Sequence, residues 1–156
     1  MRLLEKKHFK FYHIFDFNEL SKLIDRNNFV TFLNGNWKQD YLFDNAMCLR
    51  DVQDDIWAKP LFNYLNKSLN KNNHKSDMHL FFNFSSGGKS IAHRDDYNVY
   101  IVGLYGKTLY KNNDEEIYLE QGDILEIKKG EEHRSISLTP RIIASYAFYP
   151  EPEKKE

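Results

Sequence analysis

The chain has little cysteine and no long hydrophobic run, and each absence excludes a class of protein. Cys48 is the only cysteine among 156 residues, which excludes an intramolecular disulfide and a cysteine-based zinc cluster. The longest apolar stretch, near Val99–Tyr105, is far shorter than the ~20 residues that a membrane-spanning helix needs. The N-terminus continues into charged and aromatic residues and has no apolar signal core. We therefore expect a cytoplasmic protein that does not associate with membranes.

An excess of charge of either sign is also missing. The 22 lysines and arginines nearly balance the 23 aspartates and glutamates, which gives a formal net charge of −1. A protein with so little net charge creates no strong overall field. We therefore do not expect direct binding of nucleic acid, although a local basic patch is not excluded.

Aromatic residues are abundant, and many of them lie in short alternating runs. They make up 15% of the chain, and hydrophobic residues make up 41%, which is enough for the core of one domain. Alternating aromatic and β-branched residues favour sheet over helix. From residue 77 to 150, short apolar runs alternate with turn signals, a pattern typical of a sandwich or barrel. The expected strands are Met78–Phe84, Tyr97–Tyr105, Lys107–Lys111, Glu116–Leu119, Asp123–Ile127, Ser135–Leu138 and Arg141–Tyr149.

The first 76 residues have a different pattern. Phe9–Phe17 alternates like a strand, whereas apolar residues at helical spacing follow both Asn18 and Pro60. The charged tail, residues 151–156, is expected to fray. The predicted fold class is therefore mostly β (α+β). A β-barrel core over residues 77–150 carries a helix-bearing N-terminal part, residues 1–76, and the whole chain forms one domain.

Two histidines and one aspartate form the most informative pattern in this sequence. His93 and Asp95 are separated by one residue, so on a strand their side chains point to the same side and can hold one ion. His133 follows thirty-eight positions after Asp95 and must come from a different strand. Two imidazoles and one carboxylate are the facial triad of non-haem Fe(II) oxygenases, which leaves coordination positions open. Taken alone, His93 and Asp95 could equally be a surface pair that binds no metal.

Glycines frame both ligand segments. The first ligand segment resembles the first cupin motif: Gly87 is followed by five residues, the ligand pair and then Gly106. It differs from that motif in having aspartate in place of the second histidine and in lacking the usual glutamate ligand. Gly122 and Gly130 precede the distal histidine at the spacing of the second cupin motif, in which Lys128 replaces the common proline. Three ligands in place of four favour a site that keeps open positions for a cosubstrate.

A larger resemblance covers residues 78–150. The segments His93–Lys107 and Tyr118–His133 resemble the metal-binding segments of the JmjC-type, cupin-like 2-oxoglutarate oxygenases, and most closely those of the ribosomal oxygenases and asparaginyl hydroxylases. Arg141–Pro150 resembles the closing strand of that family. The resemblance implies a double-stranded β-helix, Fe(II) held by the triad, and 2-oxoglutarate as cosubstrate. It also implies hydroxylation of a side chain in a peptide or protein substrate, for instance a ribosomal protein.

A keto acid cosubstrate needs a basic residue, often with a hydroxyl, to hold its far carboxylate. The candidates in this sequence are Ser90, Lys107, Thr108 and Arg141. When the sequence is compared with that family, the position of the family's basic residue corresponds to Thr108, and the nearest lysine, Lys107, comes one residue before it. Neighbouring residues on a strand point to opposite faces, so a shift by one position turns the side chain to the other face. Arg141 offers a second route, because other oxygenases of this class place an arginine shortly after the distal histidine.

Two other functions fit the same residues. One is a metal-dependent cupin isomerase or small-molecule dioxygenase that works without a keto acid. The other is a non-catalytic binding module that kept the barrel and lost the metal. The pattern predicts no particular oligomeric state.

Overall fold

The computed structural model describes residues 1–5, 17–27, 30–32 and 46–149. The strand expected over Phe9–Phe17 lies outside the described residues except for Phe17, which begins a helix. The tail expected to fray, residues 151–156, also lies outside them.

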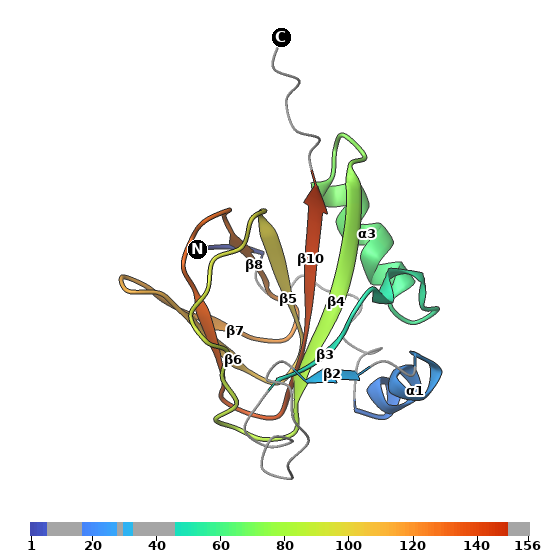
Figure 1. Ribbon diagram of the computed structural model, residues 1–156, viewed down its shortest axis with the longest axis horizontal. Coiled ribbons are helices and arrows are strands. Elements are labelled where there is room, and N and C mark those ends of the chain that lie inside the picture. Colours follow the sequence, from blue (N-terminus) through green and yellow to red (C-terminus); the bar gives the residue numbers. More distant parts are fainter. Residues whose placement is uncertain (6–16, 28–29, 33–45, 150–156) are drawn as a thin grey trace.

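Two antiparallel sheets form a barrel (Figure 1). The major sheet has seven strands in the order β1-β8-β5-β10-β4-β3-β2, and the minor sheet has three in the order β7-β6-β9. In the order of the sheet, the major strands are β1 (Arg2–Glu5), β8 (Ile124–Ile127), β5 (Val99–Tyr105), β10 (Arg141–Tyr149), β4 (Lys75–Asn83), β3 (Met47–Leu49) and β2 (Val30–Phe32). The minor strands are β7 (Glu116–Leu119), β6 (Thr108–Lys111) and β9 (Arg134–Ser137).

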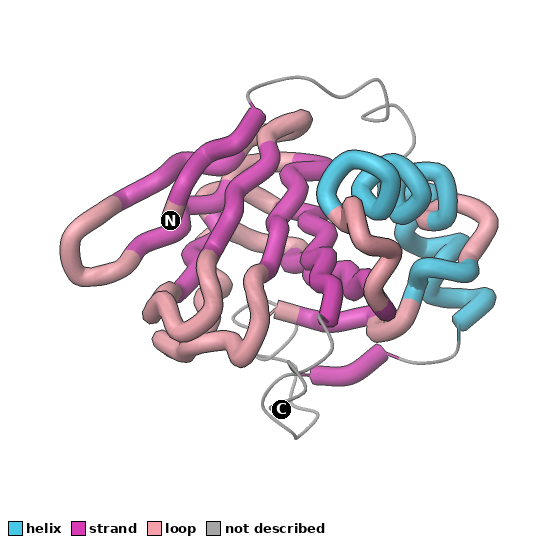
Figure 2. The backbone as a smooth tube through the Cα atoms, turned by 90° about the horizontal axis from the view of Figure 1, so that it is seen from above, coloured by secondary structure: helices cyan, strands magenta, loops and turns pink. Residues whose placement is uncertain are grey.

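Helices cover the outer face of the major sheet, on one side of the strands (Figure 2). They are α1 (Phe17–Asn27), the short 3₁₀ helix η1 (Val52–Asp54) and α3 (Lys59–Leu69). Leu20 and Leu23 of α1 are buried, as are Leu61 and Leu65 of α3. Residues three or four apart lie on one face of a helix, so each helix turns one apolar stripe to the sheet.

Strand β10 serves two hydrophobic cores because its side chains alternate in direction. On its outer side Ile142, Ala144 and Tyr146 pack with the helices. On its inner side Ile143 and Ala147 pack between the two sheets, with Val99, Ile101, Tyr110, Leu119, Leu125 and Ile127. A barrel of two facing sheets with helices on one outer face is the double-stranded β-helix that the sequence predicted. In the described part of the chain, no helix has the length and hydropathy to cross a membrane.

A close backbone approach at Gly103 gives a testable consequence for stability. A Cβ added to this residue of β5 would lie 2.0 Å from the carbonyl oxygen of Glu120. Because that atom belongs to the backbone, the strand itself would have to move. We expect Gly103→Ala to lower the free energy of unfolding by about 2–3 kcal/mol in urea titrations.

Gly87→Ala is the matched control for this prediction. A Cβ at Gly87 would meet nothing within 4 Å, and only the positive φ of 89° disfavours a side chain there. Its cost should therefore be about 1 kcal/mol. Equal losses in the two variants would show that close approach is not what requires glycine at position 103.

Candidate metal centre

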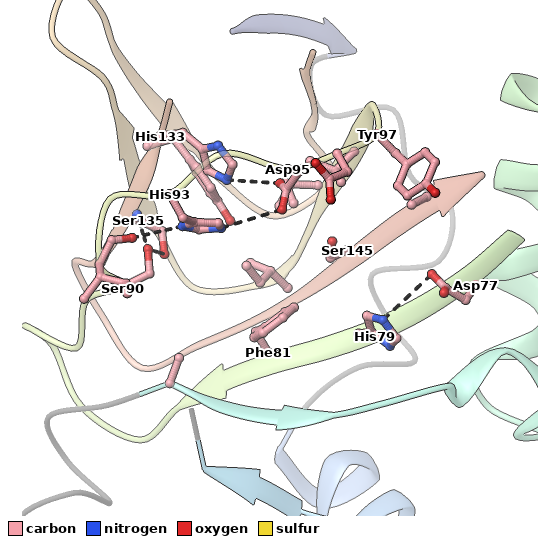
Figure 3. Close-up of a pocket in the computed structure, with 18 of the residues that line it drawn as sticks. Asp77, His79, Phe81, Ser90, His93, Asp95, Tyr97, His133, Ser135 and Ser145 are labelled. Carbon is pink, nitrogen blue, oxygen red and sulfur yellow. Dashed lines mark hydrogen bonds and ion pairs between the residues drawn. The ribbon is translucent and has the colours of Figure 1, made fainter. Parts of the chain in front are cut away.

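The chain from Gly87 to His93 runs antiparallel to β9 and extends the minor sheet. The Ser90 N–H donates to the carbonyl of Ser135 at 2.9 Å, and His93 and His133 exchange both backbone N–H···O bonds at 3.0 Å each. Residues directly opposite each other in an antiparallel pair carry their side chains on the same face. The two imidazole rings therefore lie side by side, with centroids 4.3 Å apart (Figure 3).

The pairing contains one extra residue just before His93. Lys89 stands opposite Ile136, whereas His93 stands opposite His133. The ligand segment therefore takes four steps (93 − 89) where β9 takes three (136 − 133). Such a β-bulge changes the side to which the following residues point. In an unbroken register Ala92 would face His133, and His93 would point away from it.

Asp95 brings its carboxylate to both histidines. Its Oδ1 lies 3.9 Å from Nε2 of His93, and its Oδ2 lies 3.5 Å from Nε2 of His133 (Figure 3). One ligand atom from each of the three residues lies within 4.8 Å of the others, close enough for one metal ion. The Asp95 carbonyl also accepts a hydrogen bond of 2.9 Å from the Gly130 N–H, which ties it to the turn before His133.

Backbone carbonyls orient both rings for metal binding. Nδ1 of His93 lies 3.0 Å from the carbonyl of Ile91, and Nδ1 of His133 lies 3.1 Å from the carbonyl of Glu131. When Nδ1–H donates to a carbonyl, the lone pair is left on Nε2, the atom turned toward Asp95. Burial lowers the pKa of His133, which favours the neutral ring that a metal needs. The donor set therefore suits a divalent ion.

A second group of acidic and histidine side chains, Asp51, Asp77 and His79, is arranged differently. Nδ1 of His79 accepts a hydrogen bond of 3.0 Å from the Asp51 N–H, so a neutral ring carries its proton on Nε2. That nitrogen is turned toward Asp77, 3.8 Å away, and the Tyr149 hydroxyl also donates to Asp77. A protonated Nε2 cannot bind a metal. With Nδ1 of its histidine bonded to the backbone, this group offers a metal fewer free ligand atoms than the triad does.

A cavity of about 540 Å³ lies between the sheets beside the triad. Its floor consists of inward-facing residues of β4, β5 and β10, with Arg141 near one end and Tyr149 near the other. Eight steps along the extended strand β10 separate these two residues, which is ~26 Å. The registers align Phe81 with Ile143 and His79 with Ser145, so the floor is a series of paired side chains. Others that line the cavity are Asp77, Ser90, Tyr97, Val99, Ile101, Tyr110 and Ser135.

Arg141 is buried at one end of this cavity without an acidic partner among the described residues. Its side chain is 1% exposed, and it donates to Oδ1 of Asn83 at 2.9 Å, Oγ1 of Thr108 at 3.2 Å and Oγ of Ser135 at 3.1 Å. Burial lowers the pKa of Arg141, but a guanidinium keeps its charge at neutral pH. The amide nitrogen of Asn83 is also buried without an acceptor. Donors are in excess here, which suits an anion.

Three of the four candidate cosubstrate residues meet at this end. Ser90 lines the cavity and its Oγ accepts a hydrogen bond of 2.8 Å from the Ser135 N–H, while Thr108 bonds Arg141 as described. Lys107 lies elsewhere: its side chain is exposed and its Nζ is 2.7 Å from Glu120. Because β6 begins at Thr108 with an inward residue, the position before it faces outward. The structure thus does not bring Lys107 to the cavity.

Sequence reasoning missed Tyr110, which is buried on β6 and lines the cavity. Burial raises the pKa of its hydroxyl to about 12, so the group stays a neutral hydrogen-bond donor. The sequence could have predicted that Tyr110 faces the cavity, because it lies two residues after Thr108 and residues two apart on a strand point to the same face.

No protein-family model and no curated protein matches this sequence. Solved structures do resemble it. The ribosomal oxygenase YcfD of Escherichia coli, solved with cobalt and 2-oxoglutarate, matches 90% of this chain with a TM-score of 0.69 at 20% identity. A cupin superfamily protein from Desulfitobacterium hafniense matches 69% of this chain and 81% of its own, with a TM-score of 0.51 at 13% identity. The chain spans 45% of the length of YcfD. These likenesses show that the fold is the double-stranded β-helix.

Proposed function

We propose that this protein is an Fe(II)- and 2-oxoglutarate-dependent dioxygenase that hydroxylates a side chain of a protein, for instance a ribosomal protein. The observation that carries the proposal is one cavity with a two-histidine, one-aspartate triad on its wall and an unpaired buried arginine at its end. A triad of this kind would hold a metal and leave room for a cosubstrate beside it. A keto acid bound there would have Arg141 available for its far carboxylate. The structures of YcfD with cobalt and 2-oxoglutarate, and with cobalt and succinic acid, support this choice of ligands.

The residues present fit such a group, and each has a definable task. When bound, Fe(II) and 2-oxoglutarate would supply an oxidation of C–H bonds for which side chains alone have no chemistry. His93, Asp95 and His133 would hold the metal on one face only. Arg141 would neutralise the far carboxylate. The Thr108 hydroxyl accepts a hydrogen bond from the Arg141 guanidinium and so fixes that group in place.

The opposite end of the cavity is left for the substrate. Phe81, Ile101 and Ile143 line the middle of the floor and make it apolar. Beyond them, Tyr97 and Tyr149 lie edge to face with ring centroids 4.6 Å apart. Tyr97 is 41% exposed, so this end meets solvent. We assign the entry of the substrate side chain to it, because a keto acid anchored at Arg141 occupies the other end.

Anaerobic titration tests the proposal. Fe(II) with 2-oxoglutarate should give a visible metal-to-ligand absorption band, and glutarate, which lacks the keto group, should give none. Admission of oxygen should then release succinate. The absence of both band and succinate would refute the proposal. Turnover of a small molecule with Mn(II) or Zn(II) and no keto acid would establish the cupin isomerase or dioxygenase instead.

A further inference from the structure

Two segments of this protein differ sharply in charge, although its net charge is only −1. Residues 56–76 contain four lysines and no acidic residue, whereas residues 112–132 contain eight acidic residues and two lysines. The first segment carries α3 and the second carries the β7 hairpin, and Figure 1 shows them on opposite sides of the barrel. The near-neutral total therefore hides a separation of charge.

Three exposed lysines on the helix side of the major sheet form a surface that we call the α3 basic face: Lys59, Lys67 and Lys71. Lys59 and Lys67 both lie on α3, and Lys71 stands just past the helix, whereas the fourth lysine, Lys75, begins β4 and points to the cavity side of the sheet. All four are exposed, and none forms an ion pair with another described residue. A hollow on the same surface is lined only by asparagine and lysine: Asn63, Asn66, Lys67, Asn70, Lys71 and Asn73.

We propose that the α3 basic face binds single-stranded RNA. Lysines on one surface meet neighbouring phosphates and release their counterions, which gives most of the affinity in nucleic-acid binding. Asn66 and Asn70 are hydrogen-bonded within the protein, but the amides of Asn63 and Asn73 are exposed. An exposed amide both donates and accepts hydrogen bonds, so these two suit ribose 2′-hydroxyls and base edges. Ile56, three residues before Lys59, is exposed, but no exposed large hydrophobic residue lies in residues 59–76, so a lipid bilayer would gain little apolar contact from this surface.

Lys75 continues the positive charge of the α3 basic face around β4 toward the cavity. Lys75 and Asp77 are two residues apart on β4, so their side chains point to the same side of the strand, and Asp77 lines the cavity. The ring of His74, just before Lys75, stacks on Phe148 of β10 at 6.1 Å. RNA held here would bring a protein attached to that RNA close to the cavity. The inference depends on this surface alone, so it can fail while the proposed oxygenase chemistry stands, and the reverse.

Fluorescence anisotropy of the metal-free full chain with a labelled oligouridine of about 12 nucleotides tests the inference. Binding should weaken with salt at a slope of about −2 to −3 in log–log form, as expected for three or four neutralised phosphates. The double variant Lys67→Glu/Lys71→Glu should weaken binding by at least about tenfold at about 50 mM salt. The variant Lys67→Gln/Lys71→Gln removes the charges without reversing them and should give a smaller loss in the same direction.

Lys128→Glu/Lys129→Glu is the charge-matched control. It changes the net charge by the same amount, from −1 to −5, and lies on the turn after β8, three strands from β4 in the major sheet. Equal losses in the two glutamate variants, or no binding by wild type at low salt, would overturn the proposal. So would equal affinity for oligothymidine DNA, an oligoglutamate peptide or anionic phosphatidylserine vesicles. Unchanged thermal unfolding and Co(II) binding in the variants would exclude misfolding as the cause.

Discussion

Arg141→Met should weaken 2-oxoglutarate binding by at least about 30-fold and leave the metal-free protein at least as stable as wild type. Loss of the charged partner of a buried carboxylate costs about 2–5 kcal/mol in binding, which is roughly a 30-fold to several thousand-fold rise in Kd. Without ligand, however, the guanidinium is a buried charge that bonds only neutral groups. Its removal should leave the free energy of unfolding unchanged or raise it by about 1 kcal/mol.

This pairing of effects separates a binding role from a structural one. If Arg141 only held the barrel together through its hydrogen bonds, its loss would lower stability by about 1–3 kcal/mol for each buried group left without a partner. Calorimetry of 2-oxoglutarate into the Mn(II)-loaded protein and urea unfolding of the metal-free protein measure the two quantities. Lys107→Met is the matched control: its ammonium pairs with Glu120 outside the cavity, so it should bind the keto acid like wild type. A loss in Lys107→Met with retention in Arg141→Met would move the anchor to position 107.

His93→Ala should lower the affinity for Co(II) or Mn(II) by more than about 100-fold, since changes to residues around a metal ligand alone reach that size. The His93 side chain is 43% exposed, so stability of the metal-free protein should change by no more than about 0.5 kcal/mol. Visible absorption of bound Co(II) and calorimetric titration report the affinity directly, independently of any substrate.

His79→Ala is the control for this second prediction, because the chain offers a second histidine beside aspartates in the same cavity. Its Nδ1 is occupied by the Asp51 N–H, so the variant should bind metal as wild type does. Metal binding that survived His93→Ala but not His79→Ala would place the metal centre at Asp51, Asp77 and His79 instead of at the triad. A barrel that binds no divalent ion even as wild type would instead be the non-catalytic module.

Local patterns were enough to predict most of the barrel. The bounds expected for β7 and β10 agree with the structure residue for residue, because turn signals flank both runs. Tyr97 was expected in β5 but lies before it, since the segment that follows the ligand pair bends instead of pairing. The sequence also allowed the prediction that the three side chains of the triad meet, because glycine turns constrain where each ligand segment can end.

Other features depend on pairing between distant segments and could not be read from spacing. The extra residue before His93 is visible only when Lys89 and His93 are matched to their partners on β9. An ideal strand would have shown His93 and Asp95 sharing a side, but not that His93 shares a side with Ser90, three positions away. The burial of Arg141 among neutral partners likewise needs β4, β6 and β9 in place at once.

The double use of β10 has a consequence for motion. Side chains on one side of this strand are locked into the core beneath the helices, so the strand cannot tilt or slide without opening that core. The cavity floor on its other side is therefore rigid in the absence of unfolding. Adjustment to an incoming ligand is left to exposed side chains of the opposite wall, such as Ile91 and Tyr97. Backbone hydrogen bonds hold His93 and Asp95 between them, so this adjustment would be a change of side-chain rotamers against a fixed base, on the time scale of side chains and not of a domain.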